Sequence, residues 1–92
     1  MYKETQETLI EEGMAPHAIK AFLKLQSLGC PVKTWHHGDR GHFWIDAEQP
    51  GGENFLEYWH NPCGSDRLND ILNHYGLFFE WANPGYASVY NI

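Results

Sequence analysis

Apolar residues in the segment 15–28 recur at three- and four-residue intervals, which is the spacing of one face of an α-helix. Pro16 suits the first turn of such a helix, Gly29 suits its C-terminal cap, and Pro31 prevents its continuation. The pattern therefore predicts a helix from residue 16 to residue 28, with His17 and Lys20 on a side that faces solvent. The predicted buried face consists of Ala15, Ala18, Ile19, Phe22, Leu25 and Leu28.

Two further segments favour helices. Residues 4–12 predict a short helix that Leu9 and Ile10 anchor and that Gly13 ends. Residues 66–75 predict a longer one, since Ser65 can cap its first turn and Gly76 can close it. The apolar stripe of this last helix is Leu68, Ile71, Leu72 and Tyr75.

Side chains of the segment 32–47 fall alternately on two faces, as in two β-strands, and the glycines at 38 and 41 indicate a turn between the strands. In the hairpin register that this turn predicts, Lys33 lies opposite Asp46, and two further cross-strand pairs are Trp35 with Trp44 and His37 with His42. The more aliphatic face is expected to meet the core; it carries Val32, Thr34, His36, Phe43, Ile45 and Ala47. The other face then presents two tryptophans and two histidines away from the core: Trp35, His37, His42 and Trp44.

Three more segments predict strands. Residues 55–60 follow a turn-rich stretch and would extend the hairpin into a three-stranded antiparallel meander. Residues 77–81 and 86–90 flank Asn-Pro-Gly, which fits a type II turn, and predict a C-terminal β-hairpin. The expected fold is a single α+β domain spanning 1–92. Its order is two N-terminal helices, the three-stranded antiparallel meander, one further helix and the C-terminal hairpin, with the helices packed mainly on one face of the sheet.

Charge and composition narrow the possible partners. Six basic residues against twelve acidic ones give a net charge of −6, so the average field of the molecule repels a phosphate backbone and we expect no nucleic-acid partner. No apolar run reaches the length of a membrane span, and the N-terminus lacks the features of a signal peptide. We therefore expect no membrane association and a cytoplasmic location. Two cysteines are too few for a secreted disulfide framework, although a bridge between Cys30 and Cys63 stays open.

Six histidines and two cysteines are a generous supply of metal ligands for a chain of this length. The spacing of His60 and Cys63 lets one turn present both side chains to one ion, and Cys30 with His37 or His42 would complete a tetrahedral zinc site. A structural zinc site usually carries a second ligand pair at similar spacing, and the sequence has none. We therefore expect no cofactor, and keep zinc at Cys30, His60 and Cys63 as the alternative.

Acid–base catalysis is a further alternative. His37 and His42, with Asp39, Arg40 and Asp46 nearby, would supply a base, an acid and an anion clamp. The chain contains no nucleophile elbow, no phosphate-binding glycine loop and no His-Glu-x-x-His motif. A small hydrolase or isomerase is accordingly the least favoured function; it stays open, and the sequence weighs against an enzyme without deciding the question.

Aromatic side chains make up 15% of the residues, which is more than a core of this size readily encloses. Trp and Tyr are also the residues that most often anchor protein interfaces. The sequence therefore predicts a small acidic interaction domain that binds a protein partner or forms a homo-oligomer. The expected binding surface is Trp35, His37, His42 and Trp44, and the alternative is a metal- or small-ligand-binding domain that uses His and Cys residues.

Overall fold

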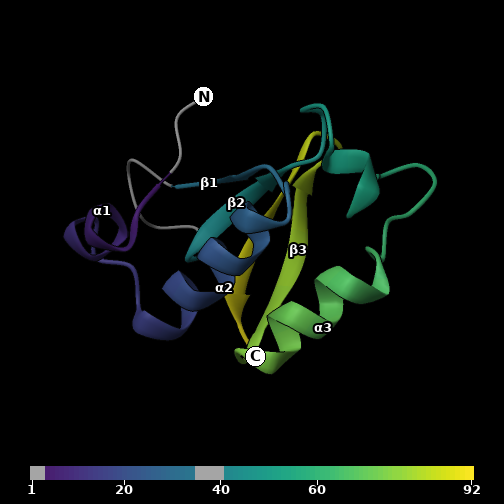
Figure 1. Ribbon diagram of the computed structural model, residues 1–92. Coiled ribbons are helices and arrows are strands. Elements are labelled where there is room, and N and C mark those ends of the chain that lie inside the picture. Colours follow the sequence, from purple (N-terminus) through teal and green to yellow (C-terminus); the bar gives the residue numbers. More distant parts are fainter. Residues whose placement is uncertain (1–3, 35–40) are drawn as a thin grey trace.

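The computed structural model describes residues 4–34 and 41–92, and within them the chain is an α+β fold (Figure 1). The helices are α1 (Gln6–Glu11), α2 (Pro16–Ser27) and α3 (Asp66–His74), with a short 3-10 helix η1 (Gly52–Asn54). The strands are β1 (Val32–Lys33), β2 (Phe43–Asp46), β3 (Leu77–Asn83) and β4 (Tyr86–Asn91). They form one antiparallel sheet in the order β1-β2-β4-β3.

The three predicted α-helices are present, and local side chains explain where they begin. The hydroxyl of Ser65 accepts a hydrogen bond from the backbone N–H of Leu68 at 3.1 Å and so caps α3. Thr5 and Thr8 form a reciprocal capping box at the start of α1, and Pro16 occupies the first turn of α2. These signals are local in sequence, which is why the helices were predictable.

The predicted three-stranded meander is wrong, because residues 55–60 do not form a strand. They follow η1 as a series of turns, with one isolated bridge between Glu57 and Asn61. Phe55 and Leu56 are consecutive and both buried, whereas neighbouring residues of a strand point to opposite faces. The place beside β2 is taken by β4, and the predicted C-terminal hairpin of β3 and β4 is confirmed.

The pairing of β1 with β2 differs in register from the prediction. Lys33 lies opposite Trp44 rather than Asp46, and Val32 lies opposite Ile45. The difference is two residues, which leaves each side chain on its predicted face. Strand β2 pairs with β4 through four residue pairs, whereas β1 has only two residues. The position of β2 in the sheet is therefore set mainly by β4. Residues 35–40 lie outside the described residues; they comprise Trp35, His36, His37 and the predicted turn except for Gly41.

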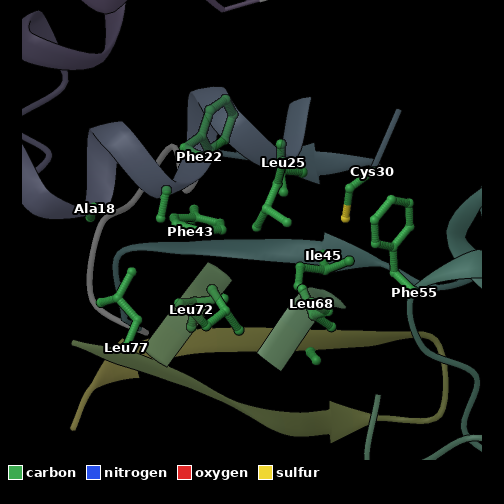
Figure 2. Packing of buried hydrophobic residues seen from close by; sticks show 14 of the residues in the cluster. Ala18, Phe22, Leu25, Cys30, Phe43, Ile45, Phe55, Leu68, Leu72 and Leu77 are labelled. Atoms are coloured by element: carbon green, nitrogen blue, oxygen red, sulfur yellow. The ribbon is translucent and has the colours of Figure 1, made fainter. Parts of the chain in front are cut away.

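Helices α2 and α3 cover one face of the sheet, and the hydrophobic core lies between them and the strands (Figure 1). The rings of Phe22 in α2 and Phe43 in β2 meet edge to face with centroids 5.2 Å apart. Burial of Val32, Phe43 and Ile45 confirms that this side of the two strands is the core side. Figure 2 shows further side chains of this cluster, among them Ala18, Leu25, Cys30, Phe55, Leu68, Leu72 and Leu77. None of the helices in the described residues is long and apolar enough to cross a membrane.

Candidate functional site

The face of the sheet opposite α2 and α3 carries a group of aromatic side chains. Ala87 and Val89 of β4 are buried beneath the helices, so Tyr86, Ser88 and Tyr90 point the other way. The strand pairings place residues of the three other strands beside them. We call this set the outer face: Lys33, Trp44, Asp46, Phe78, Glu80, Tyr86, Ser88 and Tyr90.

The aromatic residues of the outer face form two pairs. The rings of Phe78 and Tyr90, which lie opposite each other on β3 and β4, have centroids 5.9 Å apart. The rings of Trp44 and Tyr86 meet edge to face at 5.2 Å. Phe78 is 38% exposed and the other three are half-buried, so part of this aromatic surface is accessible. Such an arrangement suits contact with another apolar surface.

One row of residues runs across the middle of the outer face. Lys33 of β1 pairs with Trp44, Trp44 pairs with Ser88, and Ser88 pairs with Glu80 of β3. A cation therefore stands at one edge strand and an anion at the other. Ser88 is only 1% exposed, and its hydroxyl has no hydrogen-bond partner among residues 4–34 and 41–92. An unsatisfied buried hydroxyl costs about 1–3 kcal/mol.

The predicted binding surface is only partly the surface that the structure presents. Trp44 lies on the outer face, with its indole N–H donating to the carbonyl of Thr34 at 3.2 Å. His42 precedes β2, and its ring turns to the helix-covered side, where it contacts His17 of α2. Trp35 and His37 lie outside the described residues. Tyr86, Tyr90 and Phe78 join the surface because β4 pairs with β2, which no local sequence signal indicated.

A second polar group forms where the start of α2 meets the ends of two strands. Nε2 of His17 lies 2.6 Å from Oδ1 of Asn91, and Nε2 of His42 lies 2.8 Å from the same oxygen. The two imidazole rings meet edge to face with centroids 5.1 Å apart. We call these residues the His17–His42–Asn91 cluster. The sequence pattern placed His17 in solvent and did not indicate this cluster, because His17 and His42 are 74 and 49 residues from Asn91 along the chain.

The sequence's metal-ligand candidates occupy different environments. Cys30 is buried, and burial raises the pKa of its thiol to about 12, which disfavours the thiolate that binds metal. Cys63 and His60 are exposed, and both cysteines are unpaired thiols. Across residues 4–34 and 41–92, no three His, Cys, Asp or Glu side chains are grouped to hold a metal ion. Cys30, His60 and Cys63 are therefore not brought together as a ligand set.

The described members of the acid–base alternative have separate roles. One carboxylate oxygen of Asp46 accepts hydrogen bonds from the backbone N–H groups of Glu48 at 3.1 Å and Gln49 at 3.2 Å, which fixes the turn after β2. His42 binds Asn91 instead of Asp46. Asp39, Arg40 and His37 fall outside the described residues, so the arrangement of the whole acid–base set is not tested.

Comparison of the chain with protein-family models, with curated proteins and with solved structures found no significant match in any of the three.

Proposed function

We propose that this chain is a small interaction domain that associates with a second copy of itself through the outer face of its sheet. The observation that carries the proposal is the aromatic outer face, which lies on the side of the sheet away from α2 and α3 (Figure 1). Apolar surface of this kind on a small domain is commonly covered by another protein surface. Phe78, Trp44, Tyr86 and Tyr90 are of the residue types that anchor such contacts.

The order of charges across the outer face supports a second copy as the occupant. A two-fold axis parallel to the strands, between β2 and β4, would stack two sheets face to face with their strand orders reversed. Sheets of a β-sandwich pack with their strands within about 30° of alignment in this way. The reversal brings Lys33 of each subunit over Glu80 of the partner subunit, and Trp44 over Ser88 of the partner subunit. Unlike charges meet twice in this symmetric arrangement.

Net charge and the state of the cysteines bear on the class of partner and on the cellular compartment. The net charge of −6 makes nucleic acid a poor partner, so we keep a protein as the partner class. Two unpaired cysteines suit a reducing compartment, which supports a cytoplasmic location as part of the proposal.

Sedimentation equilibrium between about 1 and about 100 μM is the direct test, since weak specific association becomes visible in this range. We expect a dimer fraction that rises with concentration. A monomer throughout this range would refute self-association and leave a protein of different sequence as the occupant.

Charge exchange tests the proposed orientation. Lys33→Glu and Glu80→Lys each replace two attractive contacts of the dimer by repulsive ones, and each should weaken association by at least about threefold. The double variant keeps the net charge of the natural chain and should recover the affinity. Glu11→Lys, on the exposed side of α1, changes the net charge as much as Glu80→Lys does and serves as the matched control. If the double variant is as weak as the two single ones, the two-fold arrangement is wrong.

A further inference from the structure

Three Lewis-basic side chains converge at one corner of the fold. The imidazoles of His17 and His42 approach the same amide oxygen of Asn91 at 2.6 and 2.8 Å. The two Nε2 atoms therefore cannot be farther apart than the sum of these two distances. Each side chain comes from a different element: the first turn of α2, the residue before β2 and the last residue of β4.

The hydrogen bonds of this group depend on which nitrogen of each imidazole carries a proton and on the orientation of the Asn91 amide, because a turned amide would donate from its NH₂ group to both rings. An amide oxygen has two lone pairs, so it accepts from both rings only when each imidazole carries its proton on Nε2. When either ring carries the proton on Nδ1, a nitrogen lone pair points at the oxygen at close range. A cation bound by the three atoms turns this repulsion into attraction, because nitrogen and oxygen lone pairs then all act as ligands. With metal–ligand bonds of about 2.0–2.2 Å the ligand atoms of a tetrahedral site lie roughly 3.3 Å apart, so the three side chains would move outward from their hydrogen-bond distances when the ion binds.

We propose that the His17–His42–Asn91 cluster is a binding site for a divalent transition-metal ion, with Zn²⁺ as the probe that defines it. The two imidazoles bind through Nε2, and the amide binds through Oδ1. Each neutral ring moves its proton from Nε2 to Nδ1 by exchange with solvent, so binding needs no net loss of protons. Water completes the coordination, as at zinc sites that have an open position.

The ligand types select the class of metal. Imidazole suits Zn²⁺, Cu²⁺ and Ni²⁺, whereas Mg²⁺ and Ca²⁺ prefer a shell of oxygen atoms. Asn91 is exposed and both histidines are half-buried, so an ion has access from solvent. Two imidazoles and one neutral oxygen form a weaker set than three charged or imidazole ligands. We therefore expect a dissociation constant near 10 μM, an order-of-magnitude figure of about −7 kcal/mol.

Calorimetric titration with ZnCl₂ tests the site, in a Cys63→Ser background that removes an exposed thiol able to bind zinc elsewhere. We expect one saturable site for Zn²⁺, and no binding when MgCl₂ replaces ZnCl₂. His17→Ala and His42→Ala should each weaken Zn²⁺ binding at least about tenfold. His60→Ala removes an exposed histidine outside the cluster and should leave the affinity unchanged.

A variant that binds Zn²⁺ more tightly is the control for unfolding, because loss of the fold can only weaken binding. Asn91→Asp supplies a charged oxygen in the same place and should bind Zn²⁺ about tenfold more tightly, whereas Asn91→Leu should bind it less tightly. Circular dichroism confirms that each variant is folded. The site is disproved if Zn²⁺ does not saturate below about 1 mM, if His60→Ala weakens binding as much as His17→Ala, or if Asn91→Asp fails to tighten it.

Discussion

Replacing Phe43 by alanine should destabilise the fold strongly without a direct effect on the outer face. The Phe43 side chain is 0% exposed, and its ring meets that of Phe22 edge to face at 5.2 Å. Losing this burial costs about 1.5–3 kcal/mol, and the aromatic contact and residual cavity raise the total to roughly 3–5 kcal/mol. A domain of 92 residues has a free energy of unfolding of about 5–14 kcal/mol, so this one change removes a large part of it.

The neighbouring substitution Trp44→Ala should behave in the opposite way, because adjacent strand residues point to opposite faces. Trp44 is half-buried on the outer face, so its loss should cost the monomer at most about 2 kcal/mol, mainly through its contact with Tyr86 and its hydrogen bond to Thr34. Association should weaken by roughly 2 kcal/mol or more, as expected for an aromatic anchor at an interface.

Urea denaturation at about 1 μM protein, followed by circular dichroism, measures the monomer, and sedimentation equilibrium measures association. A double-mutant cycle with Phe22→Ala isolates the edge-to-face contact, and we expect a coupling of about 0.5–1.5 kcal/mol between the two phenylalanines. If Trp44→Ala destabilises the monomer as much as Phe43→Ala does, the outer face belongs to the core and the reasoning fails.

Three further changes test other features of the fold. Native Cys30 should resist a thiol reagent that modifies Cys63. Burial raises the pKa of the Cys30 thiol from 9.0 to about 12, so only the unfolded chain loses this proton between these two pH values and the folded state becomes less stable as the pH rises. Cys30→Ala should reduce this loss of stability in urea titrations. Ser88→Ala removes a buried hydroxyl that has no partner within the described part of the chain, and thermal melts should show equal or slightly higher stability, by up to about 1 kcal/mol. A clear loss would mean that the hydroxyl is satisfied. Gly52→Ala would place a Cβ atom 2.7 Å from the carbonyl oxygen of Asp46, so the variant should lose at least about 1 kcal/mol in urea titrations, and an unchanged midpoint would contradict the packing.

The parts of the fold that were predictable are those that neighbouring residues specify. The cap at Ser65 and the proline at Pro16 mark the starts of two helices, and both helices are where the pattern placed them. Alternation of Phe43, Trp44 and Ile45 assigned the two faces of β2 correctly. Each of these signals acts within a few residues and needs no knowledge of distant partners.

The errors concern contacts between distant segments. On one side β2 pairs with β1, and on the other it pairs with β4, whose residues are 40 to 46 positions further along the chain. The place that the strand predicted at 55–60 was to take is therefore occupied by β4. The outer face therefore gained Tyr86 and Tyr90, while the candidate surface from the sequence relied on the hairpin alone. The approach of His17 to Asn91 is equally non-local, since 74 residues separate them. No periodicity or motif within a short window encodes such a meeting.

The ends of β4 allow the two proposals to be separated by experiment. Tyr90 and Asn91 are consecutive, so Tyr90 points to the outer face while Asn91 points to the helix-covered side, where it meets His17. A contact surface and a metal site on opposite sides of one strand should respond to different substitutions. Tyr90→Ala should weaken association and leave Zn²⁺ affinity unchanged, and His17→Ala should do the reverse. If instead Zn²⁺ binding appears only in the dimer, the ion is shared between subunits, and its ligands are not the three side chains of one cluster.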